Sequence, residues 1–283
     1  MGETAATNIL LTGLSFGEGP RWHDGLLWFS DFYRHGIYTV DADGTEELVL
    51  EVPTQPSGLG WMPNGDLLFV SMLDRTLQRR AADGTVTLHA DLSEIADGPC
   101  NDMIVSADGT AYVGNFGFDA EVGDKFAQAT LAIVSPDGTV RRGPDGIDFP
   151  NGTVIDPTGT QLVIGESYGR RLTAFDIAAD GSLENRREFA DLGERVPDGI
   201  CLDAEGGIWV ADPANACCFR VVDGGEVTDV IELEQNCFAC MLGGNDRRTL
   251  YMLTAVTSGP KAAASHTGRV ETIRVEIPGA GLP

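Results

Sequence analysis

The sequence is poor in positive charge, and this scarcity excludes several classes of partner. Its 283 residues include 19 Lys and Arg against 43 Asp and Glu, a formal net charge of −24, and only Lys125 and Lys261 are lysines. Such an excess of negative charge repels phosphate groups. We therefore expect neither nucleic acid nor an anionic membrane as a partner, and we expect a small-molecule substrate instead.

Long apolar runs are also missing. No stretch of about 18 apolar residues could form a membrane-spanning helix. The first residues, Met1 to Thr4, lack the basic and apolar segments of a signal peptide, which predicts a cytoplasmic protein. Six cysteines in such a protein favour free thiols over a disulfide framework. The alternative, a zinc site at the lone CxxC of Cys237 and Cys240, lacks a second CxxC pair or nearby histidines.

The sequence does contain a pattern that is repeated six times. An inner apolar strand is followed by a tight turn, and a polar residue stands at the start of the strand. From Ser57 to Asp198 this leading residue lies eight positions before the glycine of the turn, and Glu18 lies seven positions before its glycine. The leading residues are Glu18, Ser57, Asn101, Asn151, Asp198 and, in a degraded last copy, Phe238.

The spacing of the repeat predicts the fold. A period of roughly 40 to 50 residues, built from short strands and Gly or Asp turns, is typical of a β-propeller with about four strands per blade. Six copies predict an all-β, six-bladed propeller that forms one domain over residues 1–283. No stretch shows sustained helical periodicity, although 93–96 could form one helical turn. The N-terminal segment 1–14, through residues 8–14, is expected to pair into the last blade, because an open ring would leave strand edges unpaired.

The leading residues should form one ring, because the innermost strands of a propeller surround its central channel. Two carboxylates and two carboxamides would then converge, which predicts a central metal-binding channel. Calcium fits this set of oxygen ligands best, and zinc, manganese or magnesium are alternatives. The competing interpretation is that these Asn and Asp residues only cap turns.

Other candidate residues lie around this ring. Polar residues at the ends of the second strands could support the ring or could be ordinary turn residues; they are Asp31, Asn115, Glu166 and Asp212. Two loops, 116–129 and 257–267, are longer than the repeat requires, and the first should overhang the mouth that Asn101 lines. Phe116, Phe118 and Trp61 could form a pocket wall or could belong to the core.

Five spaced motifs together resemble the SMP-30/gluconolactonase/LRE-like family over roughly residues 14–256. They are Gly17-Glu18-Gly19-Pro20, Asn101-Asp102, Pro150-Asn151-Gly152, Pro197-Asp198-Gly199-Ile200 and Leu250-Tyr251. The resemblance implies a six-bladed propeller that holds one divalent metal ion, often calcium, and commonly hydrolyses sugar lactones. It implies that Glu18, Asn151 and Asp198 bind the metal and that Asp198 is also the general base. It further implies that Asn101 contacts the substrate or the water, and it places Asp119 near a substrate-binding acid.

One departure from the family concerns the substrate. Members that act on sugar lactones usually have an arginine two residues before the matched asparagine, where this chain has Pro99. The loss of that charged donor, with Phe116 and Phe118 nearby, predicts a lactone less polar than an aldonolactone. Two alternatives remain. The same site could run another metal-assisted reaction, such as ester or phosphoester hydrolysis or a rearrangement, or the propeller could be a binding platform with a structural metal.

Overall fold

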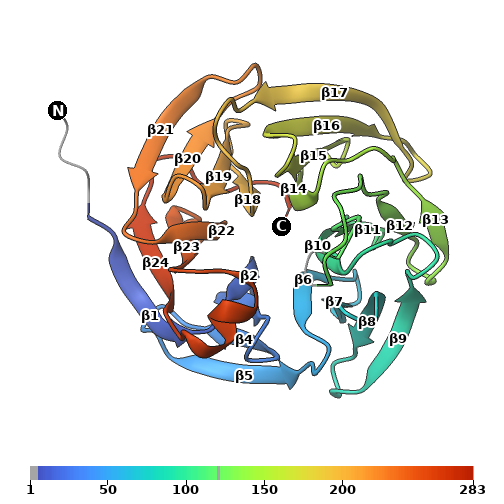
Figure 1. Cartoon of the computed structure of the whole chain (residues 1–283), viewed down its shortest axis with the longest axis horizontal. Helices are drawn as coiled ribbons and strands as arrows, with labels where there is room; N and C mark the ends of the chain where they lie inside the picture. Colours follow the sequence, from blue (N-terminus) through green and yellow to red (C-terminus); the bar gives the residue numbers. More distant parts are fainter. Residues whose placement is uncertain (1–5, 120–121, 283) are drawn as a thin grey trace.

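The predicted six-bladed propeller is confirmed by the computed structural model, which describes residues 6–119 and 122–282. Six four-stranded antiparallel sheets are arranged around a central axis (Figure 1). Each sheet is a meander whose first strand lies innermost, except that the last blade takes its outer strand from the N-terminal end of the chain. In the described part of the chain no helix is long and apolar enough to cross a membrane.

The first three blades follow the turn glycines closely, because each Asp-Gly or Asn-Gly turn joins two strands of a hairpin. Blade 1 consists of β2 (Gly17–His23), β3 (Leu26–Asp31), β4 (Gly36–Val40) and β5 (Glu46–Glu51). Blade 2 consists of β6 (Pro56–Trp61), β7 (Leu67–Ser71), β8 (Thr76–Arg80) and β9 (Val86–Asp91). Blade 3 consists of β10 (Cys100–Val105), β11 (Ala111–Asn115), β12 (Ala132–Val134) and β13 (Val140–Arg142).

The remaining blades repeat this order and close the ring. Blade 4 consists of β14 (Pro150–Ile155), β15 (Gln161–Glu166), β16 (Arg171–Ile177) and β17 (Leu183–Asp191). Blade 5 consists of β18 (Ile200–Leu202), β19 (Ile208–Asp212), β20 (Cys217–Val221) and β21 (Val227–Glu232). Blade 6 consists of β22 (Asn236–Gly243), β23 (Thr249–Ala255), β24 (Gly268–Arg274) and β1 (Asn8–Leu14).

The expected closure by the N-terminal segment is therefore confirmed. Strand β1 pairs antiparallel with β24, from Asn8 opposite Thr272 to Leu14 opposite Gly268. In Figure 1 the blue β1 lies against the red β24, so the two ends of the chain share one sheet. This pairing covers the edge of β24 that an open blade would expose.

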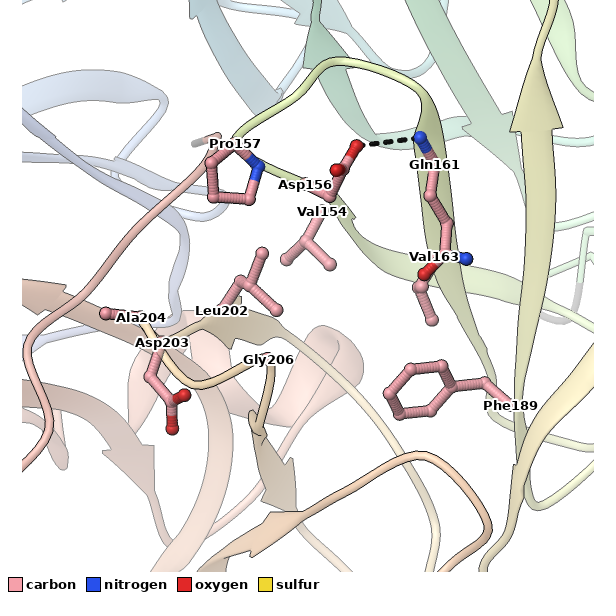
Figure 2. A pocket seen from close by; sticks show the side chains of 10 residues that line it. All are labelled: Val154, Asp156, Pro157, Gln161, Val163, Phe189, Leu202, Asp203, Ala204 and Gly206. Atoms are coloured by element: carbon pink, nitrogen blue, oxygen red, sulfur yellow. Dashed lines mark hydrogen bonds between the residues drawn. The ribbon is translucent and has the colours of Figure 1, made fainter.

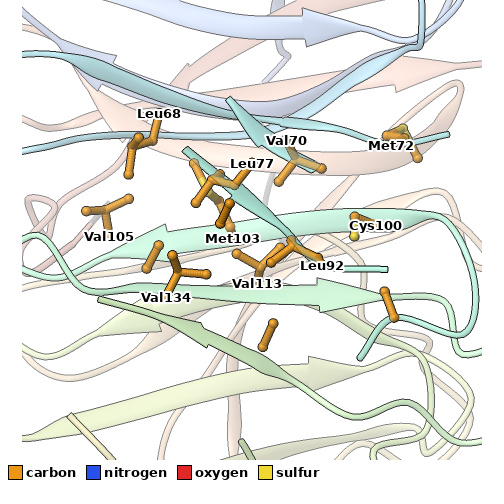
Figure 3. Packing of buried hydrophobic residues seen from close by; sticks show 14 of the residues in the cluster. Leu68, Val70, Met72, Leu77, Leu92, Cys100, Met103, Val105, Val113 and Val134 are labelled. Carbon is orange, nitrogen blue, oxygen red and sulfur yellow. The ribbon is translucent and has the colours of Figure 1, made fainter. Parts of the chain in front are cut away.

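The core lies between neighbouring blades, where the apolar faces of adjacent sheets meet. Figure 3 shows one such layer, in which Leu68, Val70 and Leu77 of blade 2 pack against residues of blade 3. Their partners include Met103, Val105, Val113 and Val134, all of which are buried. Both faces of the inner strands are covered by neighbouring blades, so strands such as β7 are buried at every position and are apolar along nearly their whole length.

Two connections differ from a simple loop. Residues 92–96 form the expected single helical turn, because the N–H of Ala96 donates to the carbonyl of Leu92 at 2.8 Å. The connection from β23 to β24 contains a 3₁₀ helix, η1 (Gly259–Ala264), whose Ala262 is fully buried in the same apolar cluster as Phe16 and Phe238. The long connection 116–129, between β11 and β12, contains no strand or helix in the part that the structure describes.

The C-terminal segment crosses the inner strands at the ends remote from Glu18 and its equivalents. Leu282 exchanges two backbone hydrogen bonds with Ile155 of β14, each at 2.9 Å, and Ala280 donates to Leu202 of β18 at 3.0 Å. The N–H of Gly279 donates to the carbonyl of Arg247, between β22 and β23, at 2.8 Å. The segment thus ties blades 4, 5 and 6 together near the centre (Figure 1).

Candidate active site

The six leading residues lie at equivalent places on the innermost strands, at one mouth of the channel. We call them the polar ring: Glu18, Ser57, Asn101, Asn151, Asp198 and Phe238. Glu18 on β2 and Asn101 on β10 are buried, with 9% and 5% of their surface exposed, while Asp198 is partly exposed just before β18. The ring therefore consists of shielded polar groups, and Asp198 is the less buried residue of its two carboxylates.

Local backbone irregularity accompanies the ring residues. In five of the six blades the pairing of the first two strands shifts register at or just after the ring residue, for example between Pro150 and Thr153. Such a β-bulge re-aims side chains and interrupts strict alternation. The following glycines permit close approach of neighbouring blades, because a Cβ on Gly152 would lie 2.3 Å from the nitrogen of Ile200. A side chain there would push blades 4 and 5 apart.

Hydrogen bonds connect the ring residues into one network. The hydroxyl of Ser57 donates to Oδ1 of Asn101 at 3.2 Å, and Nδ2 of Asn101 donates to Oδ1 of Asn151 at 3.4 Å. Nδ2 of Asn151 donates to the hydroxyl of Ser167 at 3.2 Å. The two carboxamides are therefore held in fixed orientations, and the structure brings together the side chains that the repeat predicted.

The two ring carboxylates are poorly neutralised. Burial raises the pKa of Glu18 well above its usual value, and the negative charges of Asp198 and Asp102 raise it further. Burial likewise raises the pKa of Asp198, to which Asp102 again contributes. The backbone N–H of Gly19 donates to Glu18 at 3.2 Å and partly offsets these effects. A buried carboxylate in this situation is stabilised either by a proton or by a cation.

Sequence reasoning missed a buried ion pair beside the ring. Nη2 of Arg21 lies 2.6 Å from Oδ1 of Asp102, and both residues are buried. Arg21 also donates to the carbonyls of Pro20, Leu59 and Met103, so its guanidinium joins blades 1, 2 and 3. Glu18, Asp102 and Asp198 carry three negative charges when ionised, and Arg21 supplies one positive charge. Two negative charges remain, which is the charge that one divalent cation balances.

The donor set therefore fits a hard divalent cation, with one restriction. No group of three His, Cys, Asp or Glu within residues 6–119 and 122–282 is arranged to hold a metal ion. An ion at the ring would have to take amide oxygens together with the carboxylates. Carboxylate and amide oxygens completed by water are ligands that calcium accepts. Soft thiolate ligands are absent from the polar ring itself.

The carboxylates at the ends of the second strands have a different environment. Glu166 at the end of β15 contacts Arg171 at 2.7 Å and Arg186 at 3.0 Å, and it accepts the N–H of Asp148 at 2.8 Å. Burial alone would raise the pKa of Glu166, but these donors outweigh it and lower the pKa. Asp31 accepts the N–H groups of Ser15 and Phe16, and Asp212 accepts the N–H of Val196.

These strand-end acids thus bind the backbone two or three residues before Glu18, Asn151 and Asp198. They fix the entry of three inner strands through backbone hydrogen bonds, as turn residues do. Asn115 acts within its own blade, donating to the carbonyl of Thr130 at 2.8 Å and accepting the N–H of Gly117 at 2.9 Å. Asp31, Glu166 and Asp212 thus act as turn residues whose hydrogen bonds lie next to the ring, and a supporting role for them stays a prediction.

The predicted pocket residues divide into two groups. Phe116 and Phe118 lie in the 116–129 loop and pack on Phe149, whose ring centroid is 4.6 Å from that of Phe116. Asp119 lies in the same loop, where its N–H donates to Asp124 at 3.2 Å, and its role toward a substrate stays a prediction. Trp61 lies at the opposite end of the inner strands, where its ring stacks on that of His23 with centroids 3.8 Å apart and packs beside Trp28 against the core. For this residue the structure supports the core interpretation over the pocket wall.

The cysteines are free and buried, as expected. Sγ of Cys240 lies 3.8 Å from Sγ of Cys201 and directs its hydrogen toward the carbonyls of Gly199 and Trp209. Burial raises the pKa of Cys100 to about 12 and that of Cys217 to about 11. The zinc alternative at Cys237 and Cys240 gains no support among the described residues.

A cavity of about 230 Å³ lies away from the polar ring (Figure 2). Its lining includes Val154, Phe189 and Leu202, with Asp156 and Asp203 at the turns that end the inner strands. Both carboxylates there are already engaged, since Asp156 accepts the N–H of Gln161 at 2.7 Å and Asp203 pairs with Arg220 at 2.5 Å. We assign no chemistry to this cavity.

Comparison with known proteins agrees with this architecture. The family model described as SMP-30/Gluconolactonase/LRE-like region matches residues 16–256. Pentonolactonase XacC of Haloferax volcanii is 27% identical over 268 residues, which are 91% of this chain and 87% of that protein. The solved structure of a calcium-binding protein, regucalcin, from Agrobacterium tumefaciens superposes with a TM-score of 0.82 at 23% identity, over 98% of this chain and 96% of that one.

A gluconolactonase from Xanthomonas campestris has the same fold, with a TM-score of 0.75 at 23% identity over 99% of this chain and 91% of that one. At this identity the structural matches establish the six-bladed architecture alone. The sequence model is more specific, because it spans every blade from β2 to β23 and includes all six members of the polar ring. The chain belongs to the SMP-30/gluconolactonase/LRE-like family.

Proposed function

We propose that this protein is a divalent-metal-dependent lactonase, a hydrolase that opens a cyclic ester at the polar ring. Membership in the family and relatives named pentonolactonase and gluconolactonase support the reaction class. The observation that supports it most directly is the meeting of two under-neutralised carboxylates, Glu18 and Asp198, with the carboxamides of Asn101 and Asn151 at one mouth.

Glu18, Asn151 and Asp198 are the residues that would hold the metal. Calcium is the first candidate, since the donors are carboxylate and amide oxygens and a relative of this fold is described as a calcium-binding protein. Zinc, manganese and magnesium are the alternatives. When bound, a divalent cation polarises an ester carbonyl and makes a water more acidic.

The remaining roles belong to side chains of the chain itself. Asp198 is the general base in this proposal, because it is the less buried of the two ring carboxylates and a carboxylate can take a proton from the attacking water. Asn101 is oriented by Ser57 and Asn151, so its amide can donate to the oxygen on which negative charge develops. Burial raises the pKa of Glu18 well above its usual value, so in this proposal Glu18 would be ionised only with the cation bound, and it moves no proton.

The substrate is less polar than an aldonolactone. Asn101, Asp119, Phe116 and Phe118 are the substrate-binding residues in this proposal. Pro99 supplies no side-chain donor, and its carbonyl accepts the N–H of Phe116 at 3.0 Å. Residue 99 therefore contacts the start of an aromatic loop and offers a substrate no charged group.

Substitution of the proposed base provides the test. Asp198→Asn, assayed at saturating calcium with a simple δ-lactone, should lower kcat by about 10²- to 10⁴-fold, the usual contribution of a general base. The exposed Asp223→Asn serves as the matched control and should retain full turnover. Bound calcium is measured in parallel by elemental analysis. Full turnover of Asp198→Asn with calcium still bound would show that the base assignment is wrong.

A further inference from the structure

Five aromatic side chains form a continuous surface at the mouth that holds the polar ring. We call this surface the aromatic wall; its members are Phe116, Phe118, Phe126, Phe149 and Tyr168. The rings of Phe116 and Phe149 are nearly parallel, with centroids 4.6 Å apart and an interplanar angle of 8°. Tyr168 lies 5.0 Å from Phe149 and 5.3 Å from Phe126. The wall thus joins the 116–129 loop of blade 3 to two loops of blade 4.

The wall is directly continuous with the polar ring. Phe149 precedes Asn151 by two residues, and Phe116 follows Asn115, which pairs with Cys100 next to Asn101. Tyr168 follows Ser167, whose hydroxyl accepts from Asn151. A molecule whose reacting group lay at Asn101 and Asn151 would therefore have the wall as its nearest apolar surface.

The outer part of the wall is exposed although it is aromatic. Tyr168 has 59% of its surface exposed and Phe126 has 50%. Phe118, which packs against both, is only 6% exposed. Most other exposed large apolar residues lie singly on outer strands, such as Leu48 on β5 and Leu88 on β9. Clustered exposed aromatics beside a polar site are typical of a ligand-binding surface rather than of surface scatter.

The backbone beneath the wall packs closely against residues 98 and 99. A Cβ on Gly98 would lie 2.5 Å from the carbonyl oxygen of Phe118, so the 116–118 segment packs directly on the 98–99 backbone. Pro99 accepts the N–H of Phe116 at the same place. The aromatic loop is therefore fixed against residues 98 and 99 by a close backbone contact and a hydrogen bond.

We propose that the aromatic wall binds a planar aromatic ring of the substrate, so that the substrate class is a lactone fused to or bearing an aryl group. This inference rests on the proposed function and specifies its substrate. Offset stacking and edge-to-face contacts on Phe149 and Tyr168 contribute about 0.5–1.5 kcal/mol each, or roughly two- to twelvefold in affinity. An aldonolactone, whose hydroxyls need polar partners, gains none of these contacts.

The kinetic test compares a lactone that carries an aryl ring with one that lacks it, and it compares the native protein with variants so that the better phenoxide leaving group of the aryl lactone cancels. The probes are 3,4-dihydrocoumarin and δ-valerolactone, with glucono-δ-lactone as the polar reference. We expect the native protein to favour dihydrocoumarin over glucono-δ-lactone by at least tenfold in kcat/KM. In Tyr168→Ala the ratio of kcat/KM for dihydrocoumarin over δ-valerolactone should fall three- to tenfold, mainly through KM. Tyr168→Phe should restore the ratio, and the exposed Leu88→Ala should leave it unchanged.

A binding measurement separates this inference from the proposed reaction. The lactams 3,4-dihydro-2-quinolinone and δ-valerolactam resemble the two probes but resist hydrolysis, and their binding is measured by calorimetry. If no lactone is hydrolysed, the proposed reaction fails, while tighter binding of the aryl lactam that depends on Tyr168 still supports the wall. Equal binding of both lactams, or a glucono-δ-lactone preference in the kinetic assay, overturns the aryl substrate.

Discussion

Buried carboxylates in this propeller differ in how many positive charges and N–H donors surround them. This difference separates the supporting residues from those proposed to react. Glu166 has two arginines and a backbone N–H, and Asp203 has Arg220. Glu18 and Asp198 face each other and Asp102, with Arg21 as the nearby positive charge. A charge buried without compensation lowers stability, so the second pair carries a cost that the proposed cation would offset.

Neutralising Glu18 should therefore raise the stability of the metal-free protein and abolish the stabilisation by metal. In Glu18→Gln an amide replaces an under-neutralised carboxylate, so we expect the chelator-treated protein to gain about 1–3 kcal/mol in the free energy of unfolding. Added calcium should raise the Tm of the native protein and should no longer raise that of the variant, because a charged ligand is lost. Thermal melts with chelator and with calcium measure both effects.

The control is Glu184→Gln, an exposed carboxylate on β17, which should behave as the native protein does under both conditions. A calcium-dependent Tm that survives in Glu18→Gln would remove Glu18 from the metal ligands. A native protein whose melt is the same in chelator and in calcium would count against the metal itself.

At the scale of elements, the loops that enter the inner strands are held by the strands beside them. The carboxylates of Asp31, Glu166 and Asp212 bind backbone N–H groups just before three ring residues. The β-bulges then re-aim the following side chains toward the channel. Site geometry thus depends on backbone hydrogen bonds one strand away from the reacting groups.

Glu166→Ala tests this dependence. Removing the side chain leaves Arg171 and Arg186 without their buried partner and frees the N–H of Asp148, so we expect a loss of about 3–5 kcal/mol in the free energy of unfolding. Urea denaturation measures the change. Glu194→Ala is the comparison: the side chain of Glu194 is 94% exposed and pairs with Arg170. Its removal should lower the free energy of unfolding by less than about 1 kcal/mol. Similar losses in both variants would contradict the supporting role of Glu166.

At the scale of the whole molecule, closure of the ring depends on one sheet built from both ends of the chain. Strand β1 completes blade 6, and Leu14 at its end is fully buried. The C-terminal segment separately ties blades 4, 5 and 6 at the far mouth. Strand β1 pairs with residues more than 250 positions away, and Leu282 pairs with Ile155, 127 positions away. We therefore expect the propeller to unfold as one cooperative unit.

Removal of β1 should consequently destabilise the entire protein. A variant lacking residues 1–13 leaves β24 with an open edge, and we expect it to lose most of the ~5–15 kcal/mol stability of a typical domain. The open edge should also promote association through strand pairing. Circular dichroism melts and size-exclusion chromatography measure these effects. A variant lacking only residues 2–6 keeps β1 intact and should match the full chain; equal behaviour of both truncations would refute closure by β1.

Family resemblance and repetition in the sequence predicted much of this molecule. The constant spacing between a leading polar residue and a turn glycine makes six positions equivalent, and equivalent positions on innermost strands must meet around one axis. The number of blades, closure by residues 8–14 and the membership of the polar ring follow from that argument. The metal and the reaction remain proposals, because equivalence of position does not identify a ligand.

Contacts between blades, in contrast, were decided only by the tertiary structure. Alternation along β10 puts Asp102 on the face opposite to Asn101, yet a register shift between Cys100 and Met103 breaks that alternation, and Asp102 pairs with Arg21 from blade 1. Tyr168 and Phe149 likewise join the aromatic wall from blade 4, about 30 to 50 residues away from Phe116 and Phe118. A repeat specifies which residues are alike, whereas packing between unlike residues on different blades depends on bulges and loop paths that no local pattern encodes.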